Sequence, residues 1–283
     1  MAAQATKEQL EAAKDRLEVS GPALARRKVA CLIRAGLTKG VAMEWLQRPG
    51  RIAGLWFIGT FVFSIPAVFL YDPVLNDTNY IFGGGLDARI SLGALLEIFL
   101  AISNIATAVV FYPVLKRVNQ SVALGYVASR IVESAIIVTG LISLMSVVTL
   151  RDDFTGAGAD SSSLNVAGHA LVAVHYWTFL LGPQFCAGFG NGLLLGYLMY
   201  KSELVPRQLA MLGLIGGPLA FIGGVFVLFG AIDDPSGALF AFTIIEIVWE
   251  ASLAIYLTVK GYRPSPLLAE ASSAGASWAR SSS

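Results

Sequence analysis

The sequence contains little charge and almost no cysteine. Only 14% of its 283 residues are Asp, Glu, Lys or Arg, and 55% are hydrophobic, whereas an average soluble domain has about a quarter of its residues charged. The cysteines are Cys31, in a polar N-terminal segment, and Cys186, inside an apolar block, so a disulfide framework is excluded. The net charge of +1 indicates no particular partner, and no nucleic acid is expected among the partners.

The common catalytic and cofactor motifs are also missing. The sequence has no phosphate-binding glycine loop, no G-x-S-x-G and no H-E-x-x-H. No His, Cys or carboxylate spacing matches a zinc or haem site. His169 and His175 are six residues apart, so on one helix they point about 240° apart and do not hold one metal. We therefore expect no metal and no cofactor.

What the sequence does have is long apolar blocks, each close to or above the roughly 20 residues that cross a bilayer. They cover residues 52–71, 90–115, 122–150, 164–200, 208–230 and 238–260. This pattern predicts an all-α, polytopic integral membrane bundle of about six transmembrane helices. No cleavable signal peptide precedes the first block, so the first span is expected to act as an uncleaved signal.

The fourth block is too long for a simple crossing. As one helix it would measure roughly 55 Å, so it must tilt, kink at Pro183 or begin at the membrane interface. With six spans, Arg89 and Arg151 are the only basic loop residues on one side of the membrane. The positive-inside rule then places both termini in the cytoplasm, and splitting the block would destroy this pattern.

Three regions are predicted. Residues 1–50 form a basic, amphipathic cytoplasmic lead-in, 51–263 the transmembrane domain, and 264–283 a disordered, Ser-rich cytoplasmic tail. An alternative for the lead-in is a translation start at Met43, which would make residues 1–42 dispensable. Glycines at 188, 192 and 196, and at 213 and 217, lie on single helix faces and predict close helix packing.

Ionisable and amide side chains within the spans are the candidate functional residues, because each charged one costs about 2.5–3.5 kcal/mol near the membrane centre. The main cluster is Glu97, Asn104, Arg130, Glu133, Glu246 and Glu250, and secondary candidates are His175, Gln184 and Asn191. Their depths converge near the midplane if the second, third and sixth helices are neighbours. One arginine facing four glutamates predicts that at least one carboxyl holds a proton at neutral pH.

Two interpretations of this cluster stay open. One is a structural ion pair between Arg130 and either Glu133 or Glu250. The other is a polar cavity for a ligand, a substrate or a proton, which the surplus of carboxyl groups favours.

Several short motifs occur in order along the chain: RIAGL at 51–55, YPVLK at 112–116, ALGY at 123–126, RxxE at 130–133, GYLxYxS at 196–202 with Pro206, and VKGY at 259–262. Over about residues 51–263 the chain resembles a bacterial multi-pass membrane family known as domain-of-unknown-function family 4386. The resemblance implies the topology, a bacterial inner membrane, and Arg130, Glu133 and Glu250 as recurring polar residues. Glu246 is an addition to that pattern.

Three functions are consistent with the sequence. The first is a small-molecule or proton-coupled transporter, since three spans before and three after the long outer loop give halves of opposite orientation. The second is an intramembrane enzyme acting on a lipid or isoprenoid, with a glutamate as general acid and Trp177, Trp249 and Phe185 shaping the pocket. The third is a non-catalytic membrane component that binds a partner. Expected partners are membrane lipids and a small-molecule or lipid ligand, with a homo-oligomer as a further option.

Overall fold

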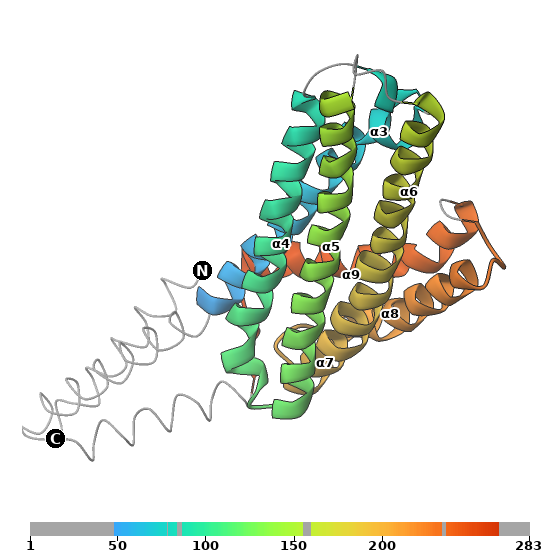
Figure 1. Cartoon of the computed structure of the whole chain (residues 1–283). Helices are drawn as coiled ribbons and strands as arrows, with labels where there is room; N and C mark the ends of the chain where they lie inside the picture. The colour runs from blue at the N-terminus through green and yellow to red at the C-terminus, as the bar shows by residue number, and fades with distance from the viewer. Residues whose placement is uncertain (1–47, 78, 84–86, 155–159, 234–235, 266–283) are drawn as a thin grey trace, which may run out of the picture. The chain divides into compact units, whose positions relative to one another are not determined.

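The computed structural model describes residues 48–77, 79–83, 87–154, 160–233 and 236–265, and the regular elements within these ranges are helices (Figure 1). Almost all of the predicted Ser-rich tail and almost all of the predicted lead-in lie outside the described residues. Six helices are long and apolar enough to span a membrane, which confirms the predicted fold class.

The spans follow one another with short connections. The first span is Arg48–Leu70, followed by the short α3 (Asp72–Asn76) and the 3₁₀ turn η1 (Tyr80–Phe82). The second and third spans are α4 (Ala88–Leu115) and α5 (Gln120–Phe154). The last two are α8 (Arg207–Leu228) and α9 (Gly237–Lys260).

The fourth block is one continuous helical span, Ser161–Ser202, in agreement with the predicted count. It begins as α6 (Ser161–Phe179), passes through two π-helical segments, η2 (Leu180–Cys186) and η3 (Gly188–Leu195), and ends as α7 (Gly196–Ser202). The wider π turns begin just before Pro183, which lacks a backbone N–H group and whose ring crowds the preceding turn of a regular α-helix.

Polar residues outside the spans fix where the helices begin. The Asp87 side chain caps α4 by accepting hydrogen bonds from the backbone N–H groups of Arg89 and Ile90. Asp160 caps α6 in the same way, and Ser236 caps α9 through the N–H of Leu239. These caps satisfy N–H groups that have no partner within the helix.

Small residues allow close contact between the fourth and fifth spans, as the sequence predicted. A Cβ atom placed on Gly188 would lie 2.8 Å from the carbonyl oxygen of Gly217, and one placed on Gly192 would collide with the Cα of Gly217. A Cβ on Gly213 would lie 2.6 Å from the Trp249 ring. These glycines therefore bring η3, α8 and α9 into close contact.

The helices pack as two groups that share the fourth span. The first group is α4, α5 and α6, which stand side by side, and the second is the hairpin of α8 and α9, which packs on η3 (Figure 1). The first span joins the second group at its beginning, where a Cβ on Gly50 would lie 2.8 Å from the backbone nitrogen of Tyr262. The two described ends of the membrane domain thus lie together on one side.

Candidate functional site

A cavity of about 540 Å³ lies among the helices and is lined by residues from all six spans. Its polar and ionisable lining residues are Thr60, Ser64, Glu97, Asn104, Arg130, Glu133, His175, Thr178, Gln184, Ser236, Thr243, Glu246 and Glu250. Most of the candidates predicted from the sequence therefore line one space.

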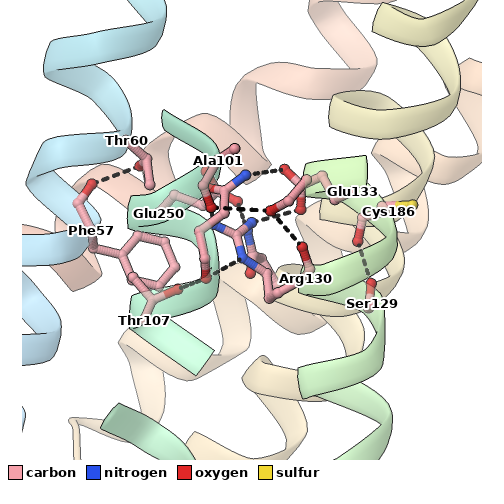
Figure 2. Close-up of polar contacts among 12 residues, drawn as sticks. Phe57, Thr60, Ala101, Thr107, Ser129, Arg130, Glu133, Cys186 and Glu250 are labelled. Atoms are coloured by element: carbon pink, nitrogen blue, oxygen red, sulfur yellow. Dashed lines mark hydrogen bonds and ion pairs between the residues drawn. The ribbon is translucent and has the colours of Figure 1, made fainter. Parts of the chain in front are cut away.

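Arg130 is the cation of this cavity and is held by two neighbours. Its Nη1 donates to Oε2 of Glu133 at 2.7 Å, Nη2 donates to Oδ1 of Asn104, and Nε donates to the Asn104 carbonyl at 3.5 Å. The Asn104 amide donates to the other Glu133 oxygen at 3.3 Å, which closes a ring of three side chains. The guanidinium also lies 5.8 Å from the centre of the Phe57 ring (Figure 2).

The sequence left open which glutamate pairs with Arg130, and the structure selects Glu133. These two residues are three apart on α5, so their side chains share one face of that helix. Arg130 is 2% exposed and Glu133 is 5% exposed. A buried pair needs additional hydrogen bonds to offset the loss of water, and Asn104 supplies them from α4.

Glu250 is half-buried on α9, and its contacts come mainly from η3. Its Oε1 accepts a hydrogen bond of 2.5 Å from Nδ2 of Asn191. The Asn191 carbonyl in turn accepts a 3.1 Å bond from Nε1 of Trp249. Glu250 and Arg130 both line the cavity, and Figure 2 labels them in one group of polar residues. Asn191 lies behind Glu250 rather than on the cavity wall.

Glu246 lies one turn before Glu250 on α9 and is 3% exposed. Neither of its carboxyl oxygens has a hydrogen-bond partner among the described residues. A Cβ added to Gly192 would lie 2.7 Å from one of these oxygens, so only the bare backbone of η3 touches it there. Glu246 is thus a buried acidic residue of the cavity lining, and its carboxyl has no hydrogen-bond partner within the described ranges.

Glu97 marks another part of the wall. Its Oε2 accepts a 3.0 Å hydrogen bond from the hydroxyl of Tyr71, just beyond the first span. Burial, and then the charge of Glu97, raise the pKa of Tyr71 far above its ordinary value, so Tyr71 stays a donor. The ring of Tyr71 also meets the ring of His175 edge to face, with 5.6 Å between ring centres.

Gln184 joins three spans at a further point. Its amide nitrogen donates to the Ala220 carbonyl at 2.7 Å and to the Thr243 hydroxyl at 3.0 Å. Gln184 belongs to η2 and Asn191 to η3, so both amides are positioned by π-helical turns. Segments of this kind are frequent at functional sites.

One prediction about the pocket is wrong. The aromatic residues proposed to shape it, Trp177, Trp249 and Phe185, do not line this cavity. Trp177 is 42% exposed, Trp249 is turned toward η3, and Phe185 packs edge-on against Phe221. The aromatic lining residues are instead Phe61, Phe179 and Phe240.

Tyr71, Thr60, Ser64 and Thr243 contribute polar groups to the cavity or its wall and were not among the predicted residues. Hydroxyl groups are cheap to place in a span, because they can bond a carbonyl of their own helix. Thr60 bonds the Phe57 carbonyl in this way and Thr243 bonds the Leu239 carbonyl. Their presence in the sequence therefore carries little signal.

Six apolar spans with large aliphatic side chains exposed along them define a multi-pass integral membrane protein. Residues 52–261 match the model of a family described as a domain of unknown function, DUF4386. The chain belongs to this family, which confirms the resemblance seen in its motifs. No curated protein and no solved structure gives a significant match.

Proposed function

We propose that this protein is a transporter of a small molecule, in which the intramembrane cavity is the binding site and a proton occupies the site in exchange. The observation that carries the proposal is the cavity of about 540 Å³ whose lining includes Glu246, a residue whose carboxyl has no hydrogen-bond partner in the described part of the chain. Small-molecule sites commonly measure about 300–1,000 Å³ and combine apolar walls with few polar groups.

The surplus of carboxyl groups supports exchange with a proton. Arg130 already has Glu133 and Asn104 as partners, and no ion pair of Glu246 is found among the residues that the structure describes. A charged carboxylate without a partner is costly inside a protein. Such a group favours occupation by a positive charge, which a proton can provide when no substrate is bound.

The fourth span contains an irregular helical stretch beside the cavity. Its π-helical stretch includes Pro183, contacts α8 through glycine backbones, and carries Gln184 and Asn191. Interrupted helices at the membrane midplane form the binding sites of many transporters. Rearrangement of this stretch would alter the wall of the cavity where Glu246 and Glu250 lie.

The orientation follows from charge. We place the side on which Gly50 and Tyr262 meet in the cytoplasm, since the basic residues Lys116, Arg117 and Lys201 end or follow spans on that side. On this view the protein lies in the inner membrane of a bacterium, with its exposed apolar side chains in contact with lipid.

An enzyme acting on a lipid or isoprenoid is the second candidate. The observation in its favour is that several apolar residues of the cavity wall are also exposed on the outer surface of the bundle, for example Ile65 and Val68 at 52% and 51%. A membrane-dissolved substrate could enter there. Chemical conversion of added lipid, lost in Glu133→Gln or Glu250→Gln, would select this candidate over transport.

The proposal is tested in two stages with wild type, Glu246→Gln and the surface control Glu203→Gln. Native mass spectrometry from nanodiscs first asks whether a small molecule is retained. Proteoliposomes containing a trapped pH-sensitive dye are then exposed to a panel of cationic, neutral and anionic solutes. A solute-dependent proton movement that disappears only in Glu246→Gln supports transport. No retained mass and no response to any solute would overturn it.

A further inference from the structure

The charges around the cavity are unevenly balanced. Its ionisable wall groups are four carboxyls, one guanidinium and one imidazole, and they are Glu97, Glu133, Glu246, Glu250, Arg130 and His175. The guanidinium is engaged by Glu133 and Asn104. The ionisable groups that remain on the wall are therefore mostly acidic.

The acidic groups differ in how far the protein satisfies them. Glu97 has the Tyr71 hydroxyl, Glu133 has Arg130 and Asn104, and Glu250 has Asn191. Glu246 has none among the described residues, although it is 3% exposed. Buried polar groups in folded proteins are nearly always hydrogen-bonded, so an orphan carboxyl on a cavity wall indicates a ligand that donates hydrogen bonds.

The rest of the wall is apolar and partly open to the side. Phe179, Phe240 and Ile247 line the cavity, and their side chains are 48%, 57% and 38% exposed. Ile65 and Val68 of the first span also line the cavity and are exposed on the outer surface of the bundle. A molecule with an apolar body can thus reach the cavity from the bilayer.

We propose that the cavity binds an amphipathic organic cation, an alkylammonium or arylalkylammonium whose N–H groups pair with Glu246 while its apolar body lies against Phe179, Phe240 and Ile247. This rests on the proposed function and specifies its substrate class. An ammonium group carries three donors and no acceptor. It therefore satisfies both orphan oxygens of Glu246 and leaves a donor for the Glu250 carboxyl one turn away.

An anion or a neutral molecule matches this site less well. An anion would meet four carboxyl groups, and the cation that could attract it is already bonded to Glu133. A neutral alcohol can donate one hydrogen bond, which leaves one Glu246 oxygen without a partner. Hydrogen bonds between charged groups are roughly twice as strong as neutral ones, so the ammonium is favoured over both.

Three probes of equal chain length separate these classes: octylamine, octan-1-ol and octanoate. Their binding to the full-length protein in nanodiscs is measured by isothermal titration calorimetry, with empty nanodiscs subtracted to remove partition into lipid. We expect octylamine to bind wild type and Glu203→Gln at least about tenfold more tightly than octan-1-ol, and this preference to vanish in Glu246→Gln.

The comparison of the three probes on wild type tests the proposal without any variant. Equal binding of octylamine and octan-1-ol, stronger binding of octanoate, or unchanged octylamine affinity in Glu246→Gln would each overturn the cation assignment. Transport of a neutral or anionic solute in the proteoliposome assay would then leave the proposed function standing. Absence of both binding and solute-dependent proton movement would reject the two together.

Discussion

Replacing Arg130 by Met tests whether the Arg130–Glu133 pair holds the bundle together. The substitution keeps an unbranched side chain but removes the donors to Glu133 and Asn104. Loss of one member of a buried pair typically costs about 3–5 kcal/mol, because the other charge stays buried without its partner. We expect a loss near 3 kcal/mol, since the unfolded chain in a micelle also finds partners for its polar groups.

The companion variants turn this loss into a coupling energy. Glu133→Gln alone should cost about 1–3 kcal/mol, because the amide oxygen of the new side chain still accepts a hydrogen bond but no longer balances the Arg130 charge. The double variant should be more stable than Arg130→Met alone, since the orphaned carboxylate is gone. The coupling is expected within the upper part of the usual range of about 0.5–3 kcal/mol.

Reversible denaturation in mixed micelles gives each free energy of unfolding. The matched control is the exposed ion pair between Arg207 and Glu203, whose N and O atoms are 2.5 Å apart and whose side chains are 63% and 42% exposed. The same double-mutant cycle on this pair should give a coupling free energy of about 0.2–1 kcal/mol at most. A loss below about 1 kcal/mol for Arg130→Met, or equal coupling in the two cycles, would refute the structural role.

Two further predictions concern packing and pH. Gly192→Ala places a methyl group against the backbone of Gly217 and should destabilise the protein by about 1–3 kcal/mol in thermal unfolding. The control is Gly125→Ala, whose Cβ would meet only a Leu194 methyl at 3.4 Å, and it should be neutral or slightly stabilising. Although burial alone would raise the pKa of Asp87, hydrogen bonds from Tyr80 and the α4 backbone and the Arg151 charge lower it. The ionised Asp87 carboxyl therefore stabilises the folded state above about pH 4, and this stabilisation is lost as the pH falls further. Asp87→Asn, which keeps the helix cap, should lose less in Tm than wild type on acidification. Curves of Tm against pH that run parallel for the two proteins would contradict this.

The number and order of the spans could be predicted because bilayer thickness and loop charge act through composition alone. A run of about 20 apolar residues has few alternatives to a spanning helix. The fourth block was longer, and the basic residues around it decided that it crosses once. The sequence left three options for that length, which were a tilt, a kink at Pro183 and a start at the membrane interface. It did not predict the two π-helical segments that the backbone forms there. Hydrogen-bond register of this kind depends on packing against α8 and has no marker in composition.

The grouping of the polar residues could be predicted only in part. Similar depth in the membrane predicted that the six polar residues of the main cluster would converge if the second, third and sixth helices were neighbours. The structure places three of them, Asn104, Arg130 and Glu133, in direct contact. Depth could not say which carboxyls would have partners, because that depends on the rotation of each helix. The bond from Tyr71 to Glu97 joins positions 26 residues apart, and no local pattern links them.

Glu97 and Glu246 line the same cavity but differ in their hydrogen-bond partners. This difference predicts that removing Glu246 raises stability while it abolishes ligand binding. Glu97 has a donor in Tyr71 and Glu246 has none among the described residues. Replacing Glu246 by Met removes an unsatisfied buried group, so the free energy of unfolding should rise by about 1–3 kcal/mol while octylamine binding is lost. Glu97→Met should lower stability by a similar amount, because the buried Tyr71 hydroxyl loses its acceptor. Denaturation of both variants in mixed micelles distinguishes two roles for Glu246. A loss of stability in Glu246→Met would show that the carboxyl is a structural group. A gain in stability together with loss of octylamine binding would identify a group retained for its ligand.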